Sequence, residues 1–361
     1  HLPETRETLE QAIDLRFDLR NSLFPLAEFG RIERYLREAE LLATTLDDQR
    51  RLGWVSAYIC SHHNATGGHA TEQRTFAQRV EAIAETLGDV PLQVVAQYYL
   101  LLACHISGDY HGTEHSCRRL MQLLEGDRTR ERFGLAAFPA VVSRAHLACT
   151  LAERGAFDEG DAHGEEALQM AEALDHPFSL IDACLNLGYL NSVRGELSQA
   201  VRLLERAIAQ CRDWHIAYLT PIGMASLGHV YAWSGRIGDG VSWLQQALTA
   251  HESAGIGWLQ SISVVQLGEA YLLADRVEDA RACADRAVML ARQRGERGHE
   301  AWALRLLGEI ASHPDRPDVA TAEAHYGAAM VLASELGMRP LVAHCHLGLG
   351  KLCRRTGKRE Q

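Results

Sequence analysis

Apolar residues recur at spacings of three, four and seven along most of the chain, as in Val201, Leu204, Ala207 and Ile208. This spacing places them on one face of an α-helix. Short polar stretches that contain glycine separate these segments, and the whole unit repeats about every 40 residues. The sequence therefore predicts an all-α chain built from repeated pairs of helices.

Each repeat is marked by a Leu-Gly pair and by small residues at fixed distances after it. Leu187-Gly188, Leu227-Gly228 and Leu267-Gly268 follow one another at intervals of 40 residues, and Ala207, Ala247 and Ala287 keep the same interval. Small side chains let two helices approach to the lower end of the ~8–10 Å range of interaxial distances. A glycine between two helices favours the left-handed backbone that ends the first of them. We therefore predict about seventeen helices, with turns near residues 30, 68, 108, 155, 195, 235, 275, 313 and 357.

The pattern Leu-Gly-x-x-Tyr-x-x-x-Gly-x-x-x-x-Ala-x-x-x-x-x-x-Ala resembles the tetratricopeptide repeat, and Tyr231, Gly235 and Ala247 carry it in one copy. The resemblance implies a right-handed superhelical solenoid of antiparallel helix pairs over residues 1–361. The period of about 40 residues exceeds the usual 34. In this respect the chain resembles the C-terminal arrays of bacterial regulators that join a STAND/AAA-type ATPase to a nucleotide-cyclase or LuxR-type DNA-binding output domain.

Both ends of the chain lie within the repeating pattern. No second helix of a pair precedes Leu2, and the chain stops at Gln361, one residue before the position where the next alanine is expected. The last helix is therefore expected to lack a partner, whereas helical arrays normally end in a unit with a polar outer face. We expect the chain to be a fragment of a longer polypeptide, and we expect the uncapped C-terminal helix to mediate self-association.

Composition narrows the classes of partner. The formal net charge of −11 argues against nucleic-acid binding, which requires a concentrated basic face. The nine cysteines are scattered singly, which is typical of reduced, buried thiols and indicates a cytoplasmic protein. Only two lysines occur among the 36 basic residues, a bias typical of GC-rich bacterial genomes. No apolar run approaches the ~20 residues of a membrane helix, so no membrane contact is expected.

Sequence motifs for catalysis are absent. The chain contains no Gly-x-x-x-x-Gly-Lys-Ser/Thr, no Gly-x-Ser-x-Gly and no His-Glu-x-x-His. It has 18 histidines, but no local group, such as His111 with His115 or His344 with His346, supplies the three or four ligands of a zinc site. We therefore predict a binding module rather than an enzyme, with no cofactor and no metal. An active site assembled in the groove from histidine and glutamate is the less favoured alternative.

The first helix of each pair is expected to line the concave surface. In tetratricopeptide arrays the residues two before and two after the leucine of Leu-Gly, and those five and six after it, point inward. Applied to this sequence, that rule gives a groove of Phe17, Phe24, Tyr58, His62, Tyr98, His105, Tyr189, His229, Trp233, Leu272, Leu273 and Trp302. Rigid aromatic rings suit peptide recognition because they add contact area at a small cost in entropy. The alternative is that these rings pack between adjacent helices.

Two functions remain open at this level. The favoured one is a protein- or peptide-binding interaction and sensing module of a larger cytoplasmic bacterial signalling or transcriptional regulator, in which the groove acts on an attached ATPase or output domain. The alternative is a stand-alone receptor for a signalling peptide or small metabolite. Inward-facing Lys and Asn residues, which chaperone-binding arrays use to clamp a peptide carboxylate, are missing from the predicted groove.

Overall fold

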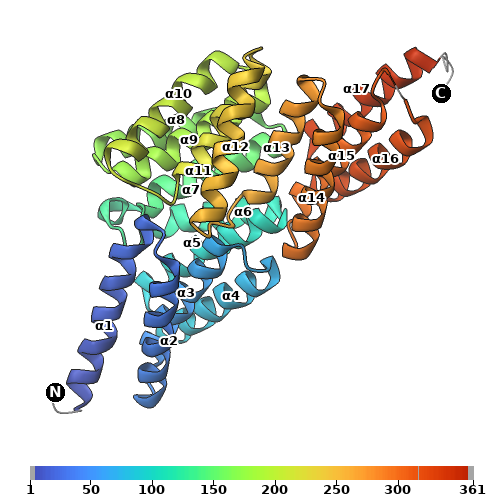
Figure 1. Cartoon of the computed structure of the whole chain (residues 1–361). Coiled ribbons are helices and arrows are strands. Elements are labelled where there is room, and N and C mark those ends of the chain that lie inside the picture. Colours follow the sequence, from blue (N-terminus) through green and yellow to red (C-terminus); the bar gives the residue numbers. More distant parts are fainter. Residues whose placement is uncertain (1–4, 316, 357–361) are drawn as a thin grey trace.

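A computed structural model describes residues 5–315 and 317–356 as an array of helical hairpins (Figure 1). These residues form seventeen α-helices and two short 3₁₀ helices, and no strand occurs among them. Nine helices are the first of a pair and eight are the second, so the predicted fold class and number of helices are confirmed. The turn predicted at residue 357 lies outside the described residues.

The first helices of the pairs are α1 (Arg6–Leu23), α3 (Gln49–Thr66), α5 (Val90–Ser107), α7 (Pro139–Arg154), α9 (Pro177–Arg194), α11 (Thr220–Trp233), α13 (Gln260–Leu273), α15 (Arg297–Ala311) and α17 (Arg339–Thr356). The second helices are α2 (Phe29–Thr45), α4 (Ala70–Leu87), α6 (Tyr110–Leu123), α8 (Phe157–Ala173), α10 (Leu197–Asp213), α12 (Ile237–Ser253), α14 (Val277–Arg294) and α16 (Val319–Leu336). The 3₁₀ helices are η1 (Phe24–Leu26) and η2 (Gly126–Arg130).

Glycine and proline set most of the helix boundaries. Gly108, Gly155 and Gly195 end α5, α7 and α9 with left-handed φ angles of +81°, +71° and +92°. The first turn differs from the prediction, because Gly30 lies in the first turn of α2 and the chain reverses at Ala27, whose φ is +59°. Pro25 explains the shift: it has no N–H with which to continue α1, so the helix ends at Leu23 and a 3₁₀ turn follows.

Small residues bring paired helices together. Ala207, Ala247 and Ala287 are fully buried, as their 40-residue interval predicts. The closest approach lies between α11 and α12, where a Cβ built on Gly240 would meet the carbonyl oxygen of Gly228 at 2.6 Å. Only glycine fits there, because real Cβ atoms do not come within 3.0 Å of another heavy atom. These small residues therefore let the two helices of a hairpin pack closely.

The superhelix also closes on itself along a seam that the repeat pattern does not indicate. The Tyr218 N–H donates to the Pro25 carbonyl (3.2 Å), and the Gly257 N–H donates to the Ala65 carbonyl (2.8 Å). Two further contacts follow the same rule: Gly108 lies against Gly298, and the Arg339 side chain donates to the Arg154 carbonyl (2.5 Å). Each contact joins the turn between the two helices of one hairpin to the start of the first helix five hairpins later.

The spacing of these contacts defines the superhelix. The paired residues are 185 to 193 positions apart, so one superhelical turn takes between four and five hairpins. Figure 1 shows the result: the orange helices α13 to α15 lie beside the cyan helices α5 and α6. The concave face is therefore enclosed as a channel along the array instead of an open groove.

Helix α5 departs from one expectation. Val90–Ser107 is 18 residues long with a mean hydropathy of 1.3, so by length and composition alone it is apolar enough to cross a membrane. However, 67% of it is buried inside the array, where the helices on either side of it in sequence and the seam surround it. Its apolar character is that of a central core helix.

Candidate binding channel

Four hollows follow one another inside the superhelix and form what we call the inner channel. We name them, from α17 to α1, the C-terminal, aromatic, central and N-terminal hollows. The C-terminal hollow shares Trp233, Glu269 and His344 with the aromatic hollow. The aromatic hollow shares Tyr189, Ile262 and Gln266 with the central hollow. The central hollow in turn shares His146, Asp182, Leu219 and Trp258 with the N-terminal hollow, which reaches α1. Because neighbours share walls, the inner channel runs from α17 to α1.

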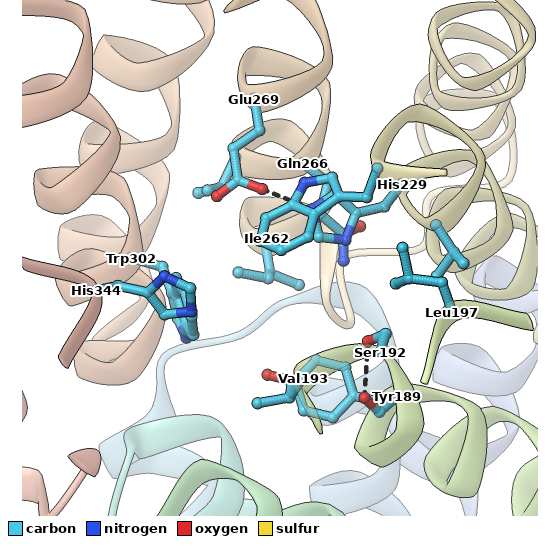
Figure 2. A pocket seen from close by; sticks show the side chains of 13 residues that line it. Tyr189, Ser192, Val193, Leu197, His229, Ile262, Gln266, Glu269, Trp302 and His344 are labelled. Atoms are coloured by element: carbon cyan, nitrogen blue, oxygen red, sulfur yellow. Dashed lines mark hydrogen bonds and ion pairs between the residues drawn. The ribbon is translucent and has the colours of Figure 1, made fainter. Parts of the chain in front are cut away.

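The aromatic hollow brings together four of the predicted groove residues from three first helices (Figure 2). They are Tyr189 on α9, His229 and Trp233 on α11, and Trp302 on α15. Trp233 is 40% exposed, although it lies 5.3 Å from His229 between ring centroids. His344 of α17 completes the wall, 5.9 Å from Trp302 and 6.3 Å from Trp233. The hollow thus offers large rings that the fold leaves partly uncovered.

A buried hydrogen-bond network fixes one wall of the aromatic hollow. Burial, with a smaller contribution from the Arg305 guanidinium, lowers the pKa of His229 to about 3, so the imidazole is neutral at pH 7. Its Nε2–H donates to the Glu269 carboxylate at 2.5 Å. Glu269 also accepts from Arg305, which donates to Glu309 at 2.5 Å. Since Arg305 is only 2% exposed, these bonds tie α11, α13 and α15 into one rigid surface.

The central hollow is more polar. The Tyr189 hydroxyl donates to the Glu153 carboxylate, and burial raises the pKa of Glu153. His105, a predicted groove residue, lines this hollow edge-on to His146 at 5.6 Å. Burial holds the pKa of His105 well below its usual range. At pH 7 this part of the inner channel therefore presents the neutral imidazole of His105 beside acidic groups.

The other predicted residues divide into two groups. Leu272 and Leu273 line the C-terminal hollow, and Phe24 and Tyr98 line the N-terminal hollow, where they are 7% and 9% exposed. Phe17, Tyr58 and His62 are not among the lining residues of these four hollows.

These three side chains pack between helices instead. Tyr58 is 2% exposed, and its ring centroid lies 5.2 Å from that of Phe17 and 5.8 Å from that of Trp54. The ring of His62 packs edge-on to that of Phe29, with 6.1 Å between centroids. For Tyr58 the packing alternative therefore holds. Its position is inward, but the seam and the loop that contains Gly134 cover it: its hydroxyl donates to the Gly134 carbonyl at 3.3 Å.

Several lining residues were missing from the predicted groove. Glu153 lies six positions after Leu147, Glu269 two after Leu267, and Arg305 two before Leu307. All three are inward positions of the same rule, and all three line a hollow. They were missed because only aromatic, histidine and leucine side chains were selected. Asp182 lies five positions before Leu187, the repeat position that Trp302 occupies before Leu307. Only its residue type, an ordinary helix carboxylate, kept it out of the predicted groove.

One group of potential metal ligands converges among the described residues. Ligand atoms of Asp275, His313 and Asp315 lie within 4.8 Å of one another at the α13–α14 and α15–α16 turns. His313 Nε2 is 3.1 Å from the Asp275 carboxylate, which explains the proximity as a surface ion pair. Both aspartates are exposed, so the group lacks the enclosed, fixed geometry of a structural metal site.

Comparison with solved structures identifies the architecture. A Rap protein in complex with competence and sporulation factor matches 96% of this chain and 98% of its own, with a TM-score of 0.63 and 12% identity. The fold is that of a tetratricopeptide-type array. NprR with its cognate peptide NprX matches 94% and 99% of the two chains, with a TM-score of 0.56 and 10% identity.

A third array of this type is the Cut9–Hcn1 hetero-tetramer of the APC/C, with a TM-score of 0.60 and 15% identity. The match covers 92% of this chain and 56% of that one. No family model and no curated protein sequence matches the chain. At these identities the likeness concerns the fold.

Proposed function

We propose that this chain is a protein- or peptide-binding sensing module that takes an extended segment into the inner channel. The observation that carries the proposal is the state of Trp233, which is 40% exposed inside a concave, enclosed surface. The protein's own side chains normally cover a ring of this size in a concave surface, so a ring left uncovered there indicates a site that a partner covers. The His229–Glu269–Arg305 network holds the surrounding wall in place without such a partner, so the surface is preorganised for binding.

The chemistry of the aromatic hollow favours a peptide. Tyr189, Trp233 and Trp302 offer apolar area, and Gln266 and Ser192 lie among them as neutral hydrogen-bonding groups. Large rings with interspersed amide and hydroxyl groups match a peptide, whose side chains are apolar and whose backbone needs donors and acceptors. Two arrays of similar fold, the Rap protein and NprR, are solved with a signalling factor or peptide bound.

The seam connects the inner channel to the rest of the array. Trp258, which lines both the central and N-terminal hollows, donates its backbone N–H to Ala65 across the seam (3.2 Å). A segment that fills the inner channel would therefore alter the contacts that hold successive superhelical turns together. We propose that this is how occupancy reaches an attached ATPase or output domain in a larger cytoplasmic bacterial regulator. A stand-alone receptor would use the same inner channel without such a domain.

Selection from a peptide library tests the proposal. A phage-displayed library of random heptapeptides is panned on the immobilised chain, with the Trp233→Ala/Tyr189→Ala double variant as the counter-selection target. We expect a consensus rich in apolar residues on the wild-type chain and its absence on the double variant. Enrichment of no consensus, or of the same consensus on both proteins, would contradict peptide binding in the aromatic hollow.

A further inference from the structure

The N-terminal hollow contains a buried cation without a counter-ion. Arg20 of α1 is 1% exposed, and no described carboxylate lies within 4.0 Å of it. Its guanidinium donates to Ser61 and to Asn21 (3.0 Å), but its Nε–H has no partner. Buried guanidinium groups are almost always paired, because desolvation of an unpaired charge is strongly unfavourable.

The lining of the same hollow also includes a carboxylate with an unused oxygen. Asp182 of α9 accepts from the Asn186 amide through Oδ1 (3.4 Å), and His146 Nε2 lies 3.7 Å from the same atom. Its Oδ2 is buried and has no partner. Arg20 and Asp182 both line the N-terminal hollow, and no ion pair joins them. Two groups of opposite charge therefore share one hollow without pairing with each other.

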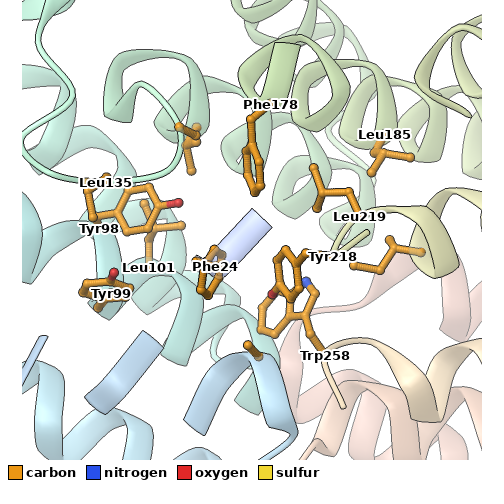
Figure 3. Packing of buried hydrophobic residues seen from close by; sticks show 14 of the residues in the cluster. Phe24, Tyr98, Tyr99, Leu101, Leu135, Phe178, Leu185, Tyr218, Leu219 and Trp258 are labelled. Atoms are coloured by element: carbon orange, nitrogen blue, oxygen red, sulfur yellow. The ribbon is translucent and has the colours of Figure 1, made fainter. Parts of the chain in front are cut away.

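Aromatic rings line the N-terminal hollow (Figure 3). Phe24 and Tyr218 are 4.8 Å apart, and Phe178 stacks on Tyr218 at 6.4 Å with an interplanar angle of 10°. Figure 3 shows Trp258 beside Tyr218 and Tyr98 on the other side of Phe24. The walls thus suit a small molecule that carries two opposite charges and an apolar group.

We propose that the N-terminal hollow binds a small zwitterion whose carboxylate pairs with Arg20 and whose ammonium group pairs with Asp182. The carboxylate would accept from Arg20 Nε–H, and the ammonium would donate to Asp182 Oδ2, so both unpartnered atoms gain a partner of opposite charge. Free amino acids and short peptides with free ends share this chemistry.

Packing alone does not account for the arrangement. The guanidinium carbon of Arg20 lies 4.4 Å from the centre of the Phe24 ring and 4.6 Å from that of Tyr58, which compensates part of its desolvation. Both rings lie over the face of the guanidinium, so they cannot accept a hydrogen bond from its Nε–H, which points within the guanidinium plane. Neither ring explains why Asp182 Oδ2 lacks a partner. The inference is independent of peptide binding in the aromatic hollow, because it concerns a separate set of residues at the other end of the inner channel.

Isothermal titration calorimetry on the whole chain tests the proposal. Each standard L-amino acid is titrated singly in one arm, and dipeptides of the same residues in a second arm. For the tightest ligand the methyl ester, which lacks the carboxylate, and the N-acetyl derivative, which lacks the ammonium group, are then compared. We expect each blocked form to bind at least ~10-fold more weakly than the zwitterion, a difference of about 1.4 kcal/mol.

Two variants assign the charges to residues. Arg20→Gln should lose the preference for the free acid over the ester, and Asp182→Asn should lose the preference for the free amine over the N-acetyl form. Arg202→Gln and Asp213→Asn on the exposed side of α10 are the controls and should keep both preferences. If Arg20→Gln fails to fold, the blocked ligands on the wild-type chain still decide the question.

The arms separate the sources of the ligand. Binding of free amino acids identifies a metabolite site. Binding of dipeptides alone shows that Arg20 and Asp182 bind the two charged ends of a short peptide. The proposal is overturned if no member of either arm binds, or if the blocked forms bind as well as the zwitterion. Failure of the heptapeptide selection would leave this result unaffected.

Discussion

His229 is the residue whose protonation state matters most for the wall of the aromatic hollow. Its Nε2–H donates to Glu269 while Glu269 also holds the Arg305 guanidinium, so a second positive charge on the imidazole would sit beside an existing one. Burial first, and Arg305 second, lower its pKa to about 3. Protonation of His229 therefore adds a second buried cation beside Arg305 and destabilises the wall.

This coupling predicts a pH dependence of stability. In the unfolded chain, histidine titrates near its ordinary pKa of about 6.5, which is above the folded value. Neutral His229 therefore contributes its full stabilisation above pH about 6.5, and this stabilisation is lost as the pH falls below about 6.5 toward the folded pKa. His229→Gln keeps an Nε2–H donor for Glu269 but does not titrate. Between pH about 7 and about 5 we expect the wild type to lose about 2 kcal/mol more stability than the variant in urea unfolding. Parallel pH profiles would contradict the assignment.

Ala247 tests the packing register at the same scale. It is fully buried on α12, so leucine at this position should overpack the contact with the neighbouring hairpins and destabilise the array by roughly 1–3 kcal/mol. Gln246→Leu places the same side chain on the exposed face of the same helix and is the control. Denaturant unfolding followed by circular dichroism measures both variants. An unchanged midpoint for Ala247→Leu would show that the position tolerates volume.

Residues of the inner channel were predictable in part. Tyr189, His229, Trp233 and Trp302 follow from repeat position, because inward positions on successive first helices must converge in a superhelix. Asp182 shares the repeat position of Trp302, but residue type argued against it, because a charged residue on a helix is ordinarily solvated. The importance of Asp182 and Arg20 comes from what surrounds them in three dimensions.

At the level of elements, α17 differs from the other first helices because no second helix covers it within the described residues. Leu347 is 56% exposed on its surface, where it also lines the C-terminal hollow. Helix α17 packs on α15, α16 and α7, and Arg339 at its start reaches Arg154 across the seam. No described helix pairs with α17 as its second helix, so Leu347 stays uncovered.

We predict that the chain self-associates through this face. Multi-angle light scattering should show a mass that rises with concentration, and Leu347→Glu should restore the monomer, because a charge on the apolar face opposes burial. Val331→Glu, on an exposed position of α16, is the matched control. A monomer at all concentrations, with strong hydrogen-exchange protection across α17, would contradict the prediction.

Helix boundaries could be predicted closely wherever glycine or proline marks them. Gly155 and Gly195 end their helices, and Pro139, Pro177 and Pro221 begin theirs. The first hairpin was misplaced because Pro25 acts on the backbone of the preceding turn, and Gly30 carries no information there. Helix α5 is apolar enough by length and composition to cross a membrane, but 67% of it is buried inside the array.

At the scale of the whole molecule, the seam converts a groove into a channel. Three of the four seam contacts named above are backbone hydrogen bonds or a close glycine approach, and the fourth uses the Arg339 side chain, so they leave no side-chain repeat in the sequence. A Cβ on Gly257 would meet the Thr66 carbonyl oxygen at 2.4 Å. Any larger residue at position 257 must therefore separate the two superhelical turns.

Gly257→Val is predicted to open the seam. The backbone at Gly257 lies outside the left-handed region, so strain comes from the contact and not from the residue itself. We expect a larger radius of gyration in small-angle X-ray scattering and a loss of roughly 1–3 kcal/mol in stability. Gly238→Val is the control, since a Cβ there meets nothing within 4 Å. Identical scattering for Gly257→Val and the wild type would show that the seam does not hold the array closed.

The most direct test of the proposed role of the inner channel is the affinity of a library-selected peptide for the wild type and for Trp233→Ala/Tyr189→Ala. Loss of two rings, each able to contribute on the order of 1–2 kcal/mol as an anchor, should weaken binding at least ~10-fold, with helix content unchanged by circular dichroism. Arg202→Ala, on the exposed face of α10, should bind as the wild type does. Equal affinity of the wild type and the folded double variant would place recognition outside the inner channel and contradict the proposal.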